Sequence, residues 1–155
     1  MTDINPNKIL SFLGALVFVG LGICIGILIG INMTKQEFSP QDWVNESQIE
    51  VYSNKFCVNY GNITWASYTD TKSMIPTFGK NANGIETKPN NPNQLKVGDI
   101  ISYKYGSELI VHRITQISYD KNGWYAITKG DNNSCDDGIK VRFSQINGVL
   151  IALIY

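Results

Sequence analysis

The sequence predicts a mainly β domain that follows one membrane-spanning helix. The 23 consecutive residues Ile9–Ile31 carry no charge. After residue 48, short runs rich in Val, Ile, Tyr, Thr and Trp alternate with Gly, Asn and Asp, the pattern of strands and turns. We therefore divide the chain into a short N-terminal tail (1–8), a transmembrane helix (9–31), a stalk (32–48) and a β-rich domain (49–155).

Composition excludes one class of partner. The chain has 155 residues, and its 13 Lys+Arg balance 13 Asp+Glu. Such a chain has no basic face that would neutralise a run of phosphates, so we expect no nucleic-acid binding. Charged residues make up 17% of the chain, below the ~25% of an average soluble protein, and much of this deficit lies in the apolar N-terminal block.

The apolar block is long enough to cross a bilayer. At ~1.5 Å per residue, Ile9–Ile31 would span roughly 34 Å as a helix, against a hydrocarbon core of ~30 Å. The alternative is a cleaved signal peptide, which has a shorter apolar region and small residues at its cleavage point. Here the block runs on into Asn32–Gln36 without such a site, which favours a retained, single-pass anchor in the lipid bilayer. Lys8 and the amino terminus lie before the block, and Lys35 with acidic residues follows it, so the positive-inside rule favours a cytoplasmic N-terminus and an extracytoplasmic domain.

Glycines recur at every fourth position of this block, at Gly22, Gly26 and Gly30. This spacing lets two membrane helices approach closely, so a helix–helix partner is one interpretation. Glycine is also common in membrane helices generally, which is the other interpretation.

The rest of the chain predicts strands joined by turns. Residues 32–48 are polar and predict a stalk with one short helical turn. Residues Asp120–Gly123 predict a hairpin turn, since Asn-Gly tolerates positive φ. The connection Phe78–Lys96 is rich in Asn, Pro and Gly and predicts mainly loop. The predicted strands are Ile49–Ser53, Asn62–Tyr68, Asp99–Tyr105, Glu108–Tyr119, Trp124–Lys129, Ile139–Phe143 and Gly148–Ile154.

The single histidine is a candidate catalytic base. Strand alternation places His112 on one face with Ile110 and Ile114, towards a partly covered surface. Histidine changes its protonation near neutral pH, although a lone strand histidine is more often structural. Other residues of the sequence favour a catalytic role for His112. A serine lies in the turn-like segment Ser73–Thr77, and acidic residues cluster within 131–137. Nucleophile, base and orienting acid are therefore all present.

Four ordered segments resemble the boxes of the type I signal peptidases. Ser73-Met74-x-Pro76-Thr77 matches the nucleophile box. The later boxes are matched by Val97–Ile101, by Val111–Ile114 and by Lys129–Asn133 with Asp136-Asp137. The resemblance covers roughly 67–155 and implies a small β-rich catalytic domain of the signal-peptidase kind behind one N-terminal transmembrane helix.

The resemblance also implies roles. A histidine at the base position is typical of the archaeal and endoplasmic-reticulum kind, whereas the usual bacterial enzymes have a lysine that must be desolvated to accept a proton. Ser73 would be the nucleophile and His112 the base. Asp137 matches the acid of the triad and Asp131 a second important aspartate that organises the loop; we favour Asp137 as the acid and keep Asp131 open. The Ser73 N–H and the Thr71 hydroxyl would form the oxyanion hole, although Thr71-Lys72 replaces the small pair found in many members.

The resemblance implies a membrane-anchored serine endopeptidase that removes signal peptides from exported preproteins after small residues. Two alternatives stay open: a specialised processing peptidase with few substrates, and a catalytically silent subunit or binding module of the same fold. We expect no cofactor and no metal, because one His without a CxxC pair makes a poor zinc site. We expect the cell membrane rather than the endoplasmic reticulum as its location.

Two cysteines follow the anchor. Cys57 and Cys135 would both face an oxidising compartment, where thiols tend to pair. A Cys57–Cys135 bridge would hold the acid box in place. The alternative is that Cys135 fills a small slot in its loop while Cys57 is buried near a strand.

Overall fold

The computed structural model describes residues 38–155, which lie within one compact unit, Glu37–Tyr155. The predicted transmembrane helix and the motif of Gly22, Gly26 and Gly30 lie outside the described residues. Within 38–155 no helix is long and apolar enough to span a membrane. The described part is mainly β, as the sequence predicts.

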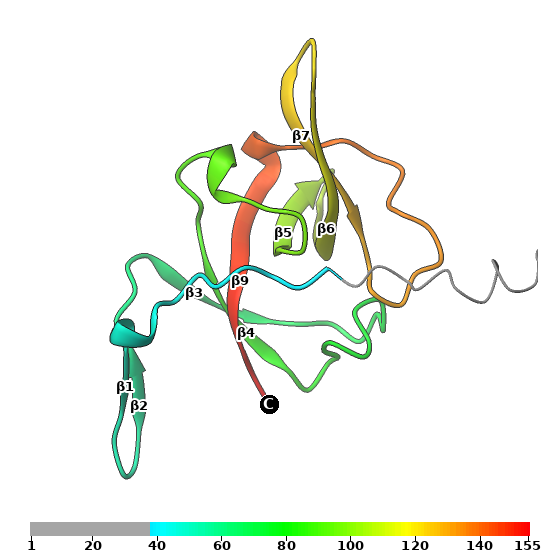
Figure 1. Ribbon diagram of the computed structural model, residues 1–155. Coiled ribbons are helices and arrows are strands. Elements are labelled where there is room, and N and C mark those ends of the chain that lie inside the picture. Colours follow the sequence, from blue (N-terminus) through cyan, green and yellow to red (C-terminus); the bar gives the residue numbers. More distant parts are fainter. Residues whose placement is uncertain (1–37) are drawn as a thin grey trace, which may run out of the picture. The chain divides into compact units, whose positions relative to one another are not determined.

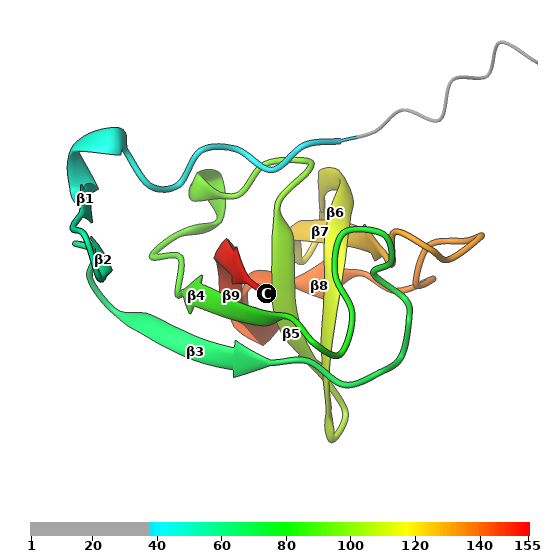
Figure 2. The same cartoon turned by 90° about the horizontal axis from the view of Figure 1, so that it is seen from below.

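Within residues 38–155, the strands form two antiparallel sheets (Figure 1). A small hairpin consists of β1 (Ile49–Val51) and β2 (Phe56–Val58). The larger sheet has the order β3-β4-β9-β5-β6-β7-β8, and Figure 2 shows β3 beside β4 at one side of it. Its strands are β3 (Ile63–Ser67), β4 (Asn83–Thr87), β5 (Ile100–Tyr105), β6 (Glu108–Asp120), β7 (Gly123–Lys129), β8 (Val141–Arg142) and β9 (Ile146–Ile154). Three single-turn 3-10 helices, η1 (Glu46–Gln48), η2 (Pro92–Gln94) and η3 (Phe143–Gln145), complete the described elements.

The connection Phe78–Lys96, predicted as mainly loop, carries β4, and that prediction is wrong in this part. β4 lies between β3 and β9 and pairs with both. Its Asn and Gly disfavour strands locally, but a side chain at Gly84 would lie 1.9 Å from the Tyr68 hydroxyl, so the site requires glycine. Tertiary pairing therefore outweighs local propensity here. The sequence also did not predict β2.

The predicted hairpin turn at Asp120–Gly123 is confirmed. Asp120 pairs with Gly123 across the turn that joins β6 and β7. Gly123 has a φ of +94°, the region that glycine enters without steric cost.

Two clusters of buried apolar side chains form the core. The larger one lies along β5, β6, β7 and β9 and includes Ile101, Tyr103 and Ile114, all at 0% exposure. The smaller one packs Met74 and Phe78 against β5 and β9. Because Met74 follows Ser73 directly, the second cluster fixes the turn that carries the candidate nucleophile.

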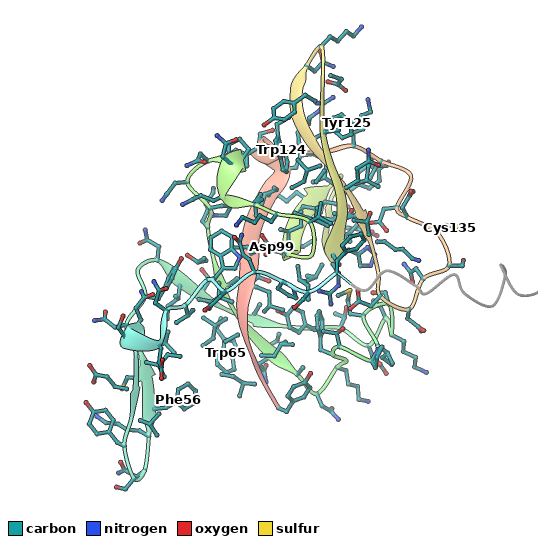
Figure 3. The ribbon with its side chains drawn as sticks, viewed as in Figure 1. Phe56, Trp65, Asp99, Trp124, Tyr125 and Cys135 are labelled. Carbon is teal, nitrogen blue, oxygen red and sulfur yellow. The ribbon has the colours of Figure 1, made fainter. Side chains whose placement is uncertain are left out.

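The segment that precedes the first strand is hydrogen-bonded to Asp99. This carboxylate is 0% exposed and accepts hydrogen bonds from the Gln41 and Lys96 backbones and from the Trp43 indole. Beside it, Gly98 has a φ of +105°, and a Cβ there would lie 2.0 Å from the Ser39 carbonyl oxygen. Residues 38–43, part of the predicted stalk, therefore pack on the start of β5 (Figure 3).

Candidate active site

Ser73 lies in the turn after β3, held from two sides. On one side the Met74 side chain is buried, with 3% exposure. On the other, the acid loop contacts the turn: the Asn132 N–H donates to the Ser73 carbonyl (2.8 Å), and its amide donates to the Lys72 carbonyl (3.2 Å). Lys72 has a φ of +60°, a conformation that glycine adopts at lower cost. The backbone at Ser73 is thus fixed by packing and by hydrogen bonds.

Met74→Ala should lower the free energy of unfolding by about 2–5 kcal/mol, because it leaves a cavity in the smaller core cluster. Met74→Leu conserves volume and should cost less than about 1.5 kcal/mol. Urea unfolding followed by tryptophan fluorescence measures both variants. Equal stability of Met74→Ala and the wild type would show that the cluster does not anchor the turn.

His112 lies on β6 at the edge of the buried face, with 9% exposure. It shares that face with Ile114, as the alternation predicts, and lies opposite Ile101 of β5. Its Nδ1 contacts the Asp137 carboxylate, at 2.9 Å from Oδ1 and 2.8 Å from Oδ2. An ionised carboxylate only accepts hydrogen bonds, so Nδ1 carries the proton and Nε2 has a free lone pair in neutral His112.

Asp137 is held by three side chains. Besides His112, the Thr128 hydroxyl (2.6 Å) and the Tyr103 hydroxyl (2.8 Å) donate to Oδ2. Its own N–H donates to the Thr128 carbonyl at 2.9 Å. Burial alone would raise the pKa of Asp137, but the hydrogen bonds from His112, Thr128 and Tyr103 outweigh burial and hold the pKa below its ordinary value. Asp137 is therefore an anion beside His112 at neutral pH.

The lowered pKa of Asp137 predicts an acid-dependent contribution to stability. A carboxyl with a lower pKa in the folded state stabilises it above the unfolded-state pKa, about 4, and this contribution is lost as the pH falls through the folded-state pKa. The free energy of unfolding should therefore fall more steeply below about pH 4 in the wild type than in Asp137→Asn. Urea unfolding across a pH series measures the slopes, and parallel curves would contradict the assignment.

Asp131 takes a different place from Asp137. It forms a bidentate ion pair with Arg113, at 2.8 Å from Nε and 2.7 Å from Nη2, and accepts a hydrogen bond from the Thr77 hydroxyl. Arg113 also donates to the Gly98 carbonyl (2.9 Å). The sequence predicts that Asp131 organises its loop; the structure adds that it connects this loop to β6 and to the nucleophile turn.

Thr71 contacts the hydroxyl of Ser73. Their hydroxyl oxygens are 3.1 Å apart, and the Ser73 N–H points to the Thr71 hydroxyl oxygen at 3.5 Å. Among residues 38–155, the Ser73 hydroxyl forms no hydrogen bond to His112. Catalytic hydrogen bonds are often absent before a substrate binds, and a rotation about the Ser73 Cα–Cβ bond redirects its hydroxyl without moving the backbone.

Gly130 separates the base from the nucleophile turn. A Cβ at this position would lie 2.9 Å from His112 Nε2 and 2.8 Å from the Ser73 carbonyl oxygen. Both groups thus lie close to the position that a Gly130 Cβ would occupy, which brings the Ser73 backbone and His112 together beside this glycine. Only glycine allows this approach.

Gly130→Ala should reduce catalytic turnover on the order of 10²-fold with the fold retained, because the methyl group must displace either Nε2 or the Ser73 backbone by a fraction of an ångström or more. Gly61→Ala is the matched control, since its Cβ meets no atom within 4 Å. Peptide cleavage rates and circular dichroism compare the two variants. Full turnover by Gly130→Ala would contradict the tight approach.

An open cleft of about 900 Å³ adjoins these residues. Its walls come from β3, from the turn with Ser73, and from the first half of β6 with His112. β3 is the end strand of the sheet, and β7 pairs with β6 only from Arg113 onward. Within the described residues, β3 and the segment 108–112 each therefore have one edge without a strand partner. Trp65 on β3 (Figure 3) is 58% exposed.

Cys57 and Cys135 are both free and exposed, so the predicted bridge is wrong. Cys57 lies on β2, next to Phe56, whereas Cys135 lies in the acid loop on the opposite side of the view (Figure 3). The alternative is also wrong in its detail, because neither thiol is buried. Sequence spacing does not report the distance between a separate hairpin and a loop of the larger sheet.

Fold and site together define a candidate serine hydrolase: a β-rich domain with a serine, a histidine–aspartate pair and an open cleft. Comparison with known proteins narrows the class. Over 67 residues the chain is 44% identical to signal peptidase complex catalytic subunit SEC11 of Clavispora lusitaniae. The aligned region covers 42% of this chain and 39% of that protein. The chain is also 44% identical over 68 residues to sec11 of Dictyostelium discoideum (42% and 37%), and 49% identical over 45 residues to SEC11 of Eremothecium gossypii (27% of each).

These relatives confirm the predicted resemblance to type I signal peptidases of the endoplasmic-reticulum kind. The matches span about two-fifths or less of the relatives' length. No protein-family model and no solved structure matches the chain.

Proposed function

We propose that the protein is a membrane-anchored serine endopeptidase that cleaves signal peptides from preproteins after small residues. One observation carries the proposal: His112, oriented by Asp137, lies beside Gly130 and close to the Ser73 backbone, in the wall of an open cleft. The similarity to catalytic subunits of signal peptidase complexes supports the choice of substrate class.

In the proposed first step, the Ser73 hydroxyl turns from Thr71 towards His112. Nε2 removes the hydroxyl proton as Oγ attacks the scissile carbonyl carbon. The rotation releases the Thr71 hydroxyl from the Ser73 hydroxyl, and the contact of the Ser73 N–H with the Thr71 hydroxyl oxygen is long, at 3.5 Å, so the N–H can leave it for a better acceptor. Both can then donate to the oxyanion, which fits the predicted oxyanion hole.

In the second step, His112 acts as the acid and donates the proton that it accepted from Ser73. The His112 imidazolium, stabilised by the Asp137 anion, gives its proton to the leaving amine, and the peptide acyl group remains as an ester on Ser73. A water molecule, deprotonated by His112, then hydrolyses that ester. Asp137 keeps its own hydrogen bonds to Thr128 and Tyr103 throughout.

The substrate would bind as an extended strand. The free edges of β3 and of 108–112 border the cleft and offer backbone donors and acceptors to such a strand. Shallow pockets between alternate side chains would then select small residues. An anchor at 9–31, with a cytoplasmic N-terminus, would hold enzyme and membrane-bound substrate in one thin layer and raise their effective concentration.

Partner subunits are part of the proposal, because the relatives are subunits of a complex. The helix motif of Gly22, Gly26 and Gly30 remains a candidate contact. The comparisons do not favour the cell membrane over the endoplasmic reticulum as the location.

Cleavage of a panel of preproteins by the full chain in detergent tests the proposal. Wild type should remove signal peptides after small residues, and Ser73→Ala should not. Cleavage of a single preprotein in the panel would support the specialised peptidase instead. No cleavage by the purified chain, alone or with its membrane partners, would support the silent subunit.

A further inference from the structure

Glu86 is a buried carboxyl at the cleft that the proposed mechanism does not use. It lies on β4 and is 4% exposed, yet it contributes to the wall of the same cleft as Ser73 and His112. A buried carboxyl is rare unless it has a partner or a function. Its position away from the His112–Asp137 pair suggests a role in binding rather than in proton transfer.

The fold makes room for this carboxyl. A Cβ at Gly148 of β9 would lie 2.7 Å from Glu86 Oε2 and 3.1 Å from the Glu86 Cβ. The Ser102 hydroxyl, itself at 0% exposure, donates to Oε2 at 2.6 Å. Among residues 38–155, Ser102 is the one hydrogen-bond partner of the Glu86 side chain. One carboxyl oxygen is thus held in place and the other is left to a ligand in the cleft.

The carboxyl stays neutral over a wider pH range than an exposed one. Burial raises the pKa of Glu86 and outweighs the hydrogen bond from Ser102, which lowers it. The nearby Tyr68 also lines the cleft, and its hydroxyl is buried without a hydrogen-bond partner. Burial, followed by the proximity of Glu86, raises the pKa of Tyr68. The cleft wall therefore contains two buried polar groups with unused hydrogen-bonding capacity.

We propose that Glu86 forms a polar subsite that selects a hydroxyl side chain, threonine or serine, at one position of the bound peptide. A hydroxyl both donates and accepts, so it matches a carboxyl group in either protonation state. A lysine or arginine would need an ionised Glu86, and the desolvation of both charges would offset their attraction. A purely apolar side chain would leave the carboxyl unpaired.

The lining of the cleft also offers apolar contacts that suit threonine. Ala66, Met74, Phe78 and Val111 line the cleft and offer apolar contacts to the threonine methyl group. Threonine and valine have nearly the same shape, so the pair isolates the hydroxyl. This inference rests on the proposed function for the identity of the ligand as a peptide, but binding tests it without cleavage.

The test measures peptide binding to the full-length Ser73→Ala chain in detergent micelles. Peptides with the sequence of a signal-peptide cleavage region have threonine or valine at each position in turn. At one position, the threonine peptide should bind about tenfold more tightly. The ratio should fall to about one in Ser73→Ala/Glu86→Leu. It should persist in Ser73→Ala/Glu46→Gln, which alters an exposed carboxyl outside the cleft.

A second measurement requires no change at Glu86. The ¹³C resonance of the Glu86 side-chain carboxyl should shift when the threonine peptide binds and not when the valine peptide binds. Equal affinities at every position, a preference that survives Glu86→Leu, or no peptide binding at all would overturn the subsite.

Cleavage of the preprotein panel distinguishes failure of the Glu86 subsite from failure of the proposed peptidase function. Cleavage without a threonine–valine difference removes the subsite and keeps the peptidase. A threonine preference in binding without cleavage by the wild type keeps the subsite and removes the peptidase.

Discussion

Ser73→Ala, His112→Ala and the double variant should each lose cleavage activity to a similar extent, on the order of 10³–10⁶-fold in kcat/KM. Ser73 cannot attack without a base, and His112 has no proton to take without Ser73, so the second substitution removes little that the first has left. A Cβ at Gly130 would meet both the Ser73 carbonyl oxygen and Nε2 of His112, so the two residues lie close together, which supports their action as one unit. Kinetics on a preprotein-derived peptide measure all three variants.

Ser53→Ala is the control for this series. Ser53 is exposed in the connection between β1 and β2, outside the walls of the cleft, so its loss should leave kcat/KM near the wild-type value. Losses in the double variant that equal the product of the single losses would mean that Ser73 and His112 act independently. Near-normal cleavage by His112→Ala would remove it as the base.

Asp137→Asn should lower kcat on the order of 10⁴-fold, the second largest expected effect. The reason lies in the hydrogen bonds of Oδ2. Thr128 and Tyr103 both donate to Oδ2, so the amide oxygen of asparagine takes that place and its NH₂ takes the place of Oδ1, 2.9 Å from His112 Nδ1. The amide then donates to Nδ1, which moves the proton of neutral His112 to Nε2 and removes the base.

Asp131→Asn is the matched comparison for Asp137→Asn. It weakens the bidentate ion pair with Arg113, so it should lower the free energy of unfolding and reduce kcat much less than Asp137→Asn does. The pair of variants decides which aspartate is the acid. A greater loss of kcat in Asp131→Asn would reverse the assignment.

The sequence predicts the architecture where the pattern is strong. Alternation along β6 places His112 on the same buried face as Ile114, and the Asn-Gly turn after β6 forms as predicted. β4 escapes prediction because its Asn83 and Gly84 are poor strand formers, and only the pairing with β3 and β9 makes this segment a strand. Glu86 was missed with it.

The sequence names candidate site residues but does not predict their contacts. His112 and Asp137 are candidates from the sequence, whereas the hydroxyls of Tyr103 and Thr128 that support Asp137 come from other strands. Register explains their convergence: β5 and β7 pair with β6 on either side, so Tyr103 and Thr128 share the face of His112. Strand pairing is a long-range property, and one sequence with alternation alone does not specify it.

Acyl-enzyme trapping identifies the nucleophile by its covalent product. The full chain in micelles is incubated with a preprotein-derived ester, quenched in acid within milliseconds to seconds, and digested for mass spectrometry. We expect one modified peptide from the wild type, with the acyl group as an ester on Ser73, and no modified peptide from Ser73→Ala or His112→Ala. Cleavage by the wild type with the acyl group on another residue, or undiminished cleavage by Ser73→Ala, would contradict the assignment of Ser73 as the nucleophile.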